Sequence, residues 1–221
     1  MKIIGHRGAR GLAPENTIAS VQKALEYGVQ EIEIDVRVTK DQRVVLVHDR
    51  FAEHNGRKLL VSAHTYKELC ELKPDLTLLD EAIRSIDHRV PLMIEVKPHV
   101  PIEPVVAVMQ DLIDAGWQAS EFSFGSFSQT TLRALHKAMP AISNVVIERL
   151  SGTYGIFRAR QLGAHRISIN HIFLRKSFLK RAIKQNYEVC VYTLNDPGKA
   201  ATLAQYGLTG VITDRPDLYT S

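Results

Sequence analysis

The chain has 221 residues, of which 45% are hydrophobic and 24% charged, a composition typical of a globular protein with a sizeable core. It contains no linker-like or low-complexity stretch, so we expect one domain over residues 1–221. The formal net charge is only +4. Because this surplus is small and the basic residues are scattered, it favours small anionic ligands and argues against a nucleic-acid partner.

The cysteine and hydropathy patterns exclude two further classes of protein. Cys70 and Cys190 form no CxxC pattern, so neither a disulfide framework nor a thiolate metal site is expected. No run approaches the roughly 20 apolar residues of a membrane helix, so we expect no stable membrane anchoring. Residues 1–4 already have the pattern of a strand, and we therefore expect no secretory leader. These features predict a cytoplasmic protein and leave its oligomeric state open.

Short apolar runs recur along the chain, and a helical pattern follows each of them. The eight predicted strands are Lys2–Gly5, Glu31–Val36, Leu92–Val96, Phe122–Phe124, Asn144–Ile147, Arg166–Ile169, Glu188–Tyr192 and Gly210–Thr213. Such alternation is typical of parallel strands joined by crossovers. Eight units in a chain of this length predict an α/β fold, a TIM-type (β/α)8 barrel; a doubly wound open sheet is the competing architecture. Few residues follow Thr213, so the last helix should be vestigial.

A ninth apolar run interrupts this alternation. Val44–Val47 follows the second strand after a gap of four residues. A parallel crossover needs about a dozen residues, so the run must return as an antiparallel hairpin strand. The returning strand should bring His48 back to the height of Asp35, beside the end of the first strand at His6.

Charged residues gather at the carboxyl ends of the predicted strands, where barrel enzymes place their active sites. They are His6, Arg7, Glu33, Asp35, His48, Glu95 and Lys97. Side chains alternate along a strand, so Glu33 and Asp35 share the inward face of the second strand. Glu95 and Lys97 share that of the third.

Three inward carboxylates without a cysteine predict a site for a hard cation, Mg²⁺ or Ca²⁺, with Mn²⁺ also suited. An unpaired buried carboxylate is costly, and a cation removes that cost at Glu33, Asp35 and Glu95. The alternative is a structural network in which these groups pair with Arg7 and Lys97. Their convergence with two histidines favours the metal.

Two histidines beside a cation, here His6 and His48, are suited to the cleavage of a phosphodiester. One imidazole accepts a proton from the attacking oxygen and the other supplies one to the leaving alcohol. The Arg7 guanidinium offers a planar fork to phosphate oxygens, and Lys97 offers a point charge. Three carboxylates, a divalent cation and these two bases sum to +1, which a phosphodiester neutralises.

Several short motifs surround these residues. They are His6–Ala9, Pro14–Thr17, Glu31–Val36, Lys40–Asp41, Val47–Asp49, Ile94–Lys97, Tyr192–Asp196 and Gly210–Pro216. In this order and spacing the sequence resembles the glycerophosphodiester phosphodiesterase family over essentially its entire length.

The resemblance implies a TIM-type barrel with metal on Glu33, Asp35 and Glu95. It also implies acid/base catalysis by His6 and His48, and the phosphate contacts by Arg7 and Lys97. In proteins of this kind a glycerol hydroxyl attacks phosphorus, and water then opens the cyclic phosphate to glycerol 3-phosphate.

Departures from the family pattern bear on the range of substrates and not on the phosphate chemistry. Tyr192 stands where the family often has tryptophan; its ring either packs against the glycerol or belongs to the barrel core. The segment after His48 is shorter than usual. The stretch Pro14–Thr17 is interpreted mainly as a loop and helix cap, with Asn16 capping a helix through Glu26; a direct part in catalysis is the alternative.

Two functions compete with the hydrolysis of small glycerophosphodiesters. A lysophospholipase D acting on lysophospholipids would require an apolar mouth. A non-catalytic binding protein would be expected to have lost a metal ligand or a histidine, and neither is lost here.

Overall fold

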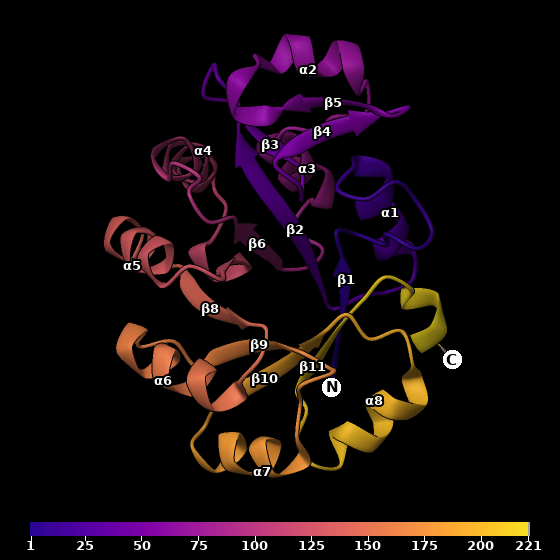
Figure 1. The fold of residues 1–221 in the computed structure, drawn as a ribbon, viewed down its shortest axis with the longest axis vertical. Coiled ribbons are helices and arrows are strands. Elements are labelled where there is room, and N and C mark those ends of the chain that lie inside the picture. Colours follow the sequence, from indigo (N-terminus) through magenta and orange to yellow (C-terminus); the bar gives the residue numbers. More distant parts are fainter. Residues whose placement is uncertain (221) are drawn as a thin grey trace.

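The computed structural model describes residues 1–220 (Figure 1). The strands are β1 Lys2–His6, β2 Glu31–Val38, β3 Val44–Leu46, β4 Phe51–His54, β5 Arg57–Leu60, β6 Leu92–Val96, β7 Phe122–Ser126, β8 Ser143–Glu148, β9 Arg166–Asn170, β10 Glu188–Tyr192 and β11 Gly210–Thr213. The α-helices are α1 Ile18–Glu26, α2 Tyr66–Leu72, α3 Leu79–Ile86, α4 Glu103–Asp114, α5 Gln129–Ala138, α6 Gly152–Leu162, α7 Lys176–Lys184 and α8 Pro197–Ala204. Three short 3-10 turns are η1 Val61–Ala63, η2 Ala119–Glu121 and η3 Pro216–Tyr219.

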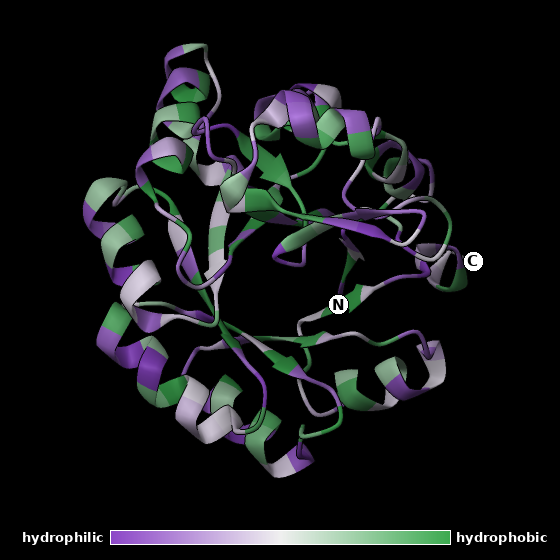
Figure 2. Ribbon diagram, turned by 45° about the horizontal axis from the view of Figure 1, so that its top comes forward, coloured by the Kyte–Doolittle hydropathy of each residue, from purple (hydrophilic) through white to green (hydrophobic). Residues whose placement is uncertain are grey.

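The strands close into a parallel ring in the order β1-β2-β6-β7-β8-β9-β10-β11. The ring is closed because β1 pairs with β2 on one side and with β11 on the other. An open sheet would leave two edge strands, whereas this arrangement leaves none within the ring. The predicted TIM-type barrel is confirmed, and all eight predicted strands take part in it. The helices surround the strands and are banded with hydrophobic and hydrophilic residues (Figure 2).

The predicted hairpin strand is also confirmed. β3 lies antiparallel to β2 outside the ring, with Leu46 opposite Val36. The Val47 amide donates to the Asp35 carbonyl at 3.1 Å, so the chain returns to the height of Asp35 just before His48. Beyond the prediction, β4 and β5 form a separate antiparallel pair, which lies with α2 above the barrel (Figure 1).

Alternation along the strands separates an outer core from the barrel interior. On β2, Ile32, Ile34 and Val36 join the buried cluster under the helices. Their neighbours on the other face are charged. Inside the ring a small apolar cluster fills the middle of the barrel; its buried members are Ile4, Met93, Val145, Cys190 and Ile212. The charged inward residues must therefore lie above or below this plug.

Two further predictions concern the last helix and the N-terminal cap of the first helix. The predicted vestigial last helix is the 3-10 turn η3. The prediction that Asn16 caps the first helix is wrong: Thr17 is the N-cap, and its Oγ1 accepts from the Ser20 amide at 3.2 Å. Asn16 has φ +57°, which turns its side chain toward the barrel instead. Within residues 1–220, no helix has the length and hydropathy required to cross a membrane.

Candidate active site

A cavity of about 420 Å³ opens at the carboxyl ends of the barrel strands. Six of the eight predicted site residues line it, namely His6, Arg7, Glu33, His48, Glu95 and Tyr192. The other two, Asp35 and Lys97, are buried and contact members of this set. The structure thus brings together residues from β1, β2, β6, β10 and the end of the hairpin, as the positions at the strand ends predicted.

The three predicted metal-binding carboxylates form a compact buried cluster. One carboxylate oxygen from each of Glu33, Asp35 and Glu95 lies within 4.8 Å of the others. Two backbone amides hold the cluster in place, because Arg7 N donates to Glu33 at 3.0 Å and Asp35 N donates to the Asn16 side chain at 3.1 Å. Within residues 1–220 it is the only group of its kind.

The cluster carries more negative charge than its surroundings balance. Burial, together with Asp35 and Glu95, raises the pKa of Glu33 well above its usual value. Burial and Asp35 likewise raise the pKa of Glu95 to about 7. Burial would also raise the pKa of Asp35, but Lys97 and Arg7 outweigh it and lower that pKa to about 2. A divalent cation would relieve this repulsion, and the oxygen donors suit Mg²⁺ or Ca²⁺.

Arg7 and Lys97 face the carboxylates. Lys97 Nζ contacts a carboxylate oxygen of Asp35 and lies 2.5 Å from Glu95 Oε1. Arg7 Nε lies 3.1 Å from Asp35 Oδ2. These are the ion pairs expected if the cluster were only a structural network. They stabilise the charged forms of Arg7 and Lys97: burial lowers the pKa of each side chain, but the neighbouring carboxylates raise it overall.

The network is nevertheless incomplete, because Glu33 has neither a lysine nor an arginine side chain as an ion-pair partner among the described residues. The ion pair it does form is with His6 Nε2 at 4.0 Å. Glu33 is 2% exposed, so water compensates little of its charge. The residues present therefore fit a bound cation better than a self-sufficient structural network.

His6 is oriented by a residue that the sequence analysis did not single out. Its Nδ1 lies 2.6 Å from Asp214 Oδ1, which leaves Nε2 on the side of Glu33. Asp214 is itself held by Asn195, whose side-chain oxygen accepts from the Asp214 amide at 2.9 Å. The available signal was a carboxylate directly after the last strand, which barrel closure places beside β1.

His48 is held in a similar way at the end of the hairpin. Its Nδ1 lies 2.8 Å from Asp49 Oδ1. Its carbonyl accepts from Arg37 Nε at 3.1 Å and from Arg37 Nη2 at 2.9 Å. Burial lowers the pKa of the His48 imidazole, although Asp35 opposes the shift. Both histidines thus use Nδ1 for positioning and keep Nε2 available.

The stretch Pro14–Thr17 contributes more than a loop. Asn16 Nδ2 donates to Asp35 Oδ2 at 3.0 Å, and Glu15 Oε1 accepts from Arg7 Nη1 at 2.8 Å. The sequence analysis placed neither side chain in the site. Both act on residues that it did place there.

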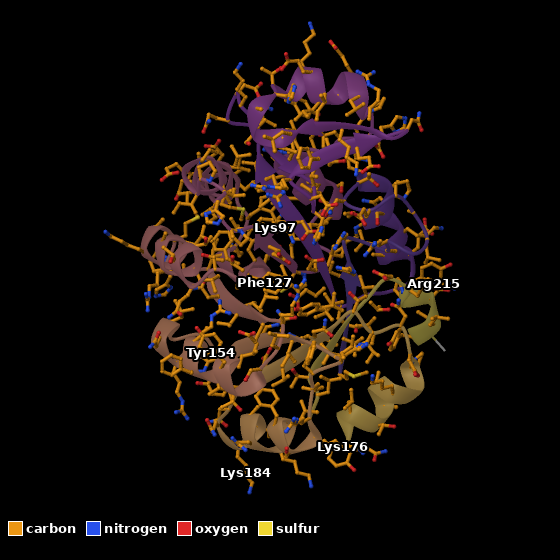
Figure 3. The ribbon with its side chains drawn as sticks, viewed as in Figure 1. Lys97, Phe127, Tyr154, Lys176, Lys184 and Arg215 are labelled. Atoms are coloured by element: carbon orange, nitrogen blue, oxygen red, sulfur yellow. The ribbon has the colours of Figure 1, made fainter. Side chains whose placement is uncertain are left out.

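Tyr192 combines the two roles considered for it. Its hydroxyl donates to the Glu148 carbonyl at 3.0 Å, as a packed core residue would. Its ring also lines the cavity and meets Phe127 edge-on, with ring centroids 6.2 Å apart. Figure 3 labels Phe127 below Lys97 in the middle of the molecule.

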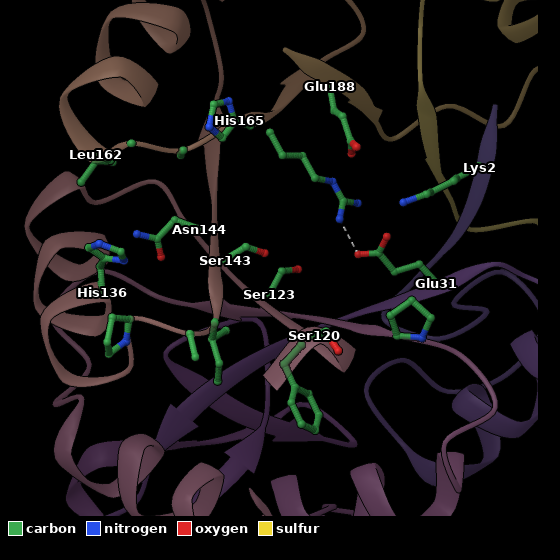
Figure 4. Close-up of a pocket in the computed structure, with 18 residues that line it drawn as sticks. Lys2, Glu31, Ser120, Ser123, His136, Ser143, Asn144, Leu162, His165 and Glu188 are labelled. Atoms are coloured by element: carbon green, nitrogen blue, oxygen red, sulfur yellow. Dashed lines mark hydrogen bonds and ion pairs between the residues drawn. The ribbon is translucent and has the colours of Figure 1, made fainter. Parts of the chain in front are cut away.

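A second cavity of about 480 Å³ lies at the opposite end of the strands (Figure 4). It is lined by Lys2, Glu31, Arg166 and Glu188, among others. Arg166 Nη1 pairs with Glu31 Oε1 at 2.7 Å. None of the predicted site residues lies here.

A closed parallel barrel with buried carboxylates and two histidines at its carboxyl-end mouth is the architecture of a barrel enzyme. Residues 6–218 match the Glycerophosphoryl diester phosphodiesterase family. A glycerophosphodiester phosphodiesterase of Bacillus altitudinis is 25% identical and covers 98% of this chain and 95% of its own length. The lysophospholipase D GDPD1 of Rattus norvegicus is 26% identical over 96% of this chain and 83% of its own length.

A solved structure agrees with these sequence matches. The phosphodiesterase OLEI02445 of Oleispira antarctica, in complex with the product sn-glycerol-3-phosphate, superposes with a TM-score of 0.89. It is 25% identical, and the match covers 100% of this chain and 97% of that one. The chain therefore belongs to the Glycerophosphoryl diester phosphodiesterase family. The enzyme class expected from the resemblance, a glycerophosphodiester phosphodiesterase, is confirmed.

Proposed function

We propose that the chain hydrolyses glycerophosphodiesters to glycerol 3-phosphate and an alcohol, with a divalent cation on Glu33, Asp35 and Glu95. The observation that carries this proposal is the buried carboxylate cluster, whose oxygens lie within 4.8 Å of one another beside two histidines on one cavity. The product complex of the Oleispira antarctica relative supports the same choice of substrate.

In this proposal the two imidazoles move the protons. Each keeps Nδ1 on a carboxylate, Asp214 for His6 and Asp49 for His48. Hydrogen bonds of this kind fix the ring and its tautomer, so that Nε2 is free to accept or donate a proton. One histidine takes the proton of the attacking glycerol hydroxyl. The other protonates the oxygen of the departing alcohol.

The bases around the cluster bind and orient the phosphate. Arg7 and Lys97 together provide two positive charges in a site where each is less than 10% exposed, and buried charges interact strongly with an entering anion. Tyr192 and Phe127 form an aromatic wall against which the glycerol carbons pack. When bound, a divalent cation supplies Lewis-acid polarisation of a phosphate oxygen.

The proposed reaction has two steps. Attack of the glycerol hydroxyl forms a phosphorus–oxygen bond and breaks the bond to the head-group alcohol. Water then opens the cyclic phosphate. The site residues given above include no serine or cysteine, and this route requires no protein nucleophile.

The test is a coupled assay of glycerol 3-phosphate release from glycerophosphocholine. We expect EDTA to abolish the release and Mg²⁺, Ca²⁺ or Mn²⁺ to restore it. Phosphorus NMR of the reaction should show a transient cyclic phosphate. Full activity in the chelator would rule out the role of the cation, and a time course without the cyclic species would rule out the two-step route.

Three finer expectations stay predictions. They are the cytoplasmic location, the organisation as one domain over residues 1–221, and the identity of the cation. Retention of both histidines and all three carboxylates around one cavity is the reason for preferring turnover over a non-catalytic binding role.

A further inference from the structure

Basic residues are scattered over the chain as a whole, but one segment contains them without a single acidic residue. Between Arg149 and Tyr187 the sequence has nine lysine and arginine residues and no aspartate or glutamate. All 24 acidic residues and the other 19 basic residues lie outside this segment. The segment comprises α6, β9, α7 and the loops after β8 and β9. The positive charge of the protein is therefore concentrated there.

Seven of the nine basic residues in this segment are exposed. They are Arg149, Arg160, Arg175, Lys176, Lys180, Arg181 and Lys184. The other two, Arg158 and Arg166, pair with Glu148 and Glu31. Among residues 1–220 no carboxylate lies within ion-pair distance of the seven exposed side chains. Their charge is therefore free to attract an external anion.

The exposed bases lie on one side of the barrel. The helices α6 and α7 are neighbours there (Figure 1), and Figure 3 labels Tyr154, Lys176 and Lys184 on this side. Lys176 Nζ lies 4.6 Å from the centroid of the Tyr206 ring, and Lys180 Nζ lies 5.3 Å from it. These cation–π contacts hold both ammonium groups at the surface.

Exposed apolar side chains lie among these bases. Six of the eleven exposed large hydrophobic residues belong to the same segment, namely Leu150, Tyr154, Phe157, Ile172, Phe173 and Ile183. The Tyr154 and Phe157 rings stack with centroids 6.1 Å apart. Leu150, Ile172 and Phe173 surround one depression together with Arg175. Apolar residues that gather in this way indicate an interaction surface more often than those that occur singly.

We propose that this surface docks the protein reversibly onto an anionic lipid membrane. We call it the basic face and define it as the seven exposed bases and six exposed apolar residues given above. Lysine and arginine side chains attract the phosphates of anionic lipids. Apolar side chains beside them insert between the lipid headgroups. The basic face offers both kinds of contact, and each alone gives only weak binding.

The apolar residues favour a membrane over a nucleic acid as the partner. RNA would use the bases, and aromatic rings can stack on nucleobases. Leu150 and Ile172 are the most exposed of the apolar residues, at 62% and 70%, and neither has a ring with which to stack. Insertion among lipid headgroups removes such aliphatic side chains from water.

Docking of this kind is peripheral, in agreement with the absence, within residues 1–220, of a helix able to cross a membrane. Leu150 follows β8, and Ile172 and Phe173 follow β9. The basic face therefore borders the carboxyl ends of the strands, where the candidate active site opens. Docking would hold that opening near the lipid headgroups. It does not depend on the proposed hydrolysis.

The test is cosedimentation of the full chain with lipid vesicles. Vesicles of phosphatidylcholine are compared with vesicles that also contain about 30% phosphatidylglycerol, which supplies the negative surface potential. We expect the partition coefficient to be at least about tenfold higher for the anionic vesicles, and to fall to the level of the neutral vesicles when NaCl is raised from about 0.05 M to about 0.5 M. Equal binding to both kinds of vesicle, or binding to neither, would overturn the proposal.

Matched lysine variants locate the electrostatic contact. Lys180→Gln combined with Lys184→Gln should lower the partition coefficient for anionic vesicles by about tenfold, since each base near the surface contributes up to about fivefold. Lys40→Gln combined with Lys67→Gln removes the same charge from exposed positions near α2, at the other end of the molecule in Figure 1. This control should stay within twofold of wild type. Equal losses would show that net charge alone acts, and not the basic face.

A leucine pair tests the apolar contact. Leu150→Ser should lower the partition coefficient by about fivefold, as expected for a leucine that is partly buried on docking. Leu218→Ser removes a leucine of η3 that is 43% exposed and should bind as wild type does. Equal binding by the two variants would reduce the contact to electrostatics. That result, or release from the vesicles by single-stranded RNA at an equal phosphate concentration, would overturn the choice of a lipid partner.

His6→Ala separates docking from the proposed reaction. His6 lies outside the basic face, so this variant should bind anionic vesicles as wild type does. Loss of binding would mean that the vesicles are held through the candidate active site, which would overturn the proposal. A wild type that binds vesicles but releases no glycerol 3-phosphate would refute the proposed hydrolysis and leave the docking surface intact.

Discussion

Each end of this barrel holds a cavity lined by charged residues, and the larger of the two is not the candidate active site. The cavity at the amino ends of the strands measures about 480 Å³, against about 420 Å³ at the mouth. The amino-end cavity contains Lys2, Arg166, Glu31 and Glu188, two bases and two acids. At the mouth, three carboxylates lie within 4.8 Å of one another. Among residues 1–220, Glu33 has no lysine or arginine as an ion-pair partner.

The difference shows that the candidate active site is distinguished by its cluster of carboxylates and not by the volume of its cavity. Side chains at the amino ends of barrel strands generally serve stability, and the Arg166–Glu31 pair fits that role. At the mouth, repulsion between carboxylates raises the pKa of Glu33 and Glu95. Such an arrangement costs folding free energy unless a ligand compensates it. Four substitutions test this contrast, each with a counterpart at the other end of the barrel or away from the mouth.

The largest expected effect is on catalysis at the mouth. His6→Ala should lower kcat/KM for glycerophosphocholine by about 10² to 10⁴, the range for loss of a general acid or base. His165→Ala, at the other cavity, should change it less than twofold. Circular dichroism checks that both variants fold. Comparable losses in both would mean that the two ends do not differ in function.

Substitution of a glycine should also distinguish the two ends of the barrel, here through the free energy of unfolding. Gly8 has φ +83°, and a Cβ there would lie 2.5 Å from Ser20. Gly8→Ala combines a left-handed conformation with this clash and should lower the free energy of unfolding by about 3 kcal/mol. Gly163 at the amino-end cavity also has a positive φ, +63°, but with nothing within 4 Å. Gly163→Ala should cost only about 1 kcal/mol in urea unfolding. Equal costs would contradict the tight turn after β1.

The amino-end ion pair should affect stability and not the reaction. Glu31→Gln leaves the partly buried Arg166 without its carboxylate partner, and we expect a loss of about 3 kcal/mol in the free energy of unfolding. The kcat of the folded variant should stay within twofold of wild type. Glu188→Gln, an exposed carboxylate at the same cavity, should cost less than about 0.5 kcal/mol. A large fall in kcat for Glu31→Gln would give this end a part in catalysis.

The smallest expected effect concerns the orientation of His6. Asp214→Asn keeps the shape of the side chain but weakens the contact of 2.6 Å to His6 Nδ1. We expect kcat to fall by about tenfold with KM nearly unchanged, because a misplaced imidazole lowers the rate of proton transfer. Glu121→Gln disturbs a similar pair, with His88 at 2.7 Å, outside the mouth. It should leave kcat unchanged, and a tenfold fall there too would point to general destabilisation.

The sequence alone predicted the barrel and the hairpin, which the structure confirms. It also proposed the residues of the candidate site, whose roles stay predictions. Strand alternation has a period of two, so Glu33 with Asp35 and Glu95 with Lys97 had to share an inward face once their strands were recognised. The short link after the second strand permitted only an antiparallel return, which placed His48. These inferences depend on local geometry, and the structure agrees with each of them.

The tertiary structure decided which residues support that site. Asp214 reaches His6 across 208 positions of sequence, because barrel closure pairs β11 with β1. Asn16 serves Asp35 and not the first helix, because Thr17 takes the cap. Ring closure and loop packing are long-range events with no local periodicity, so the order of residues carried little signal for them.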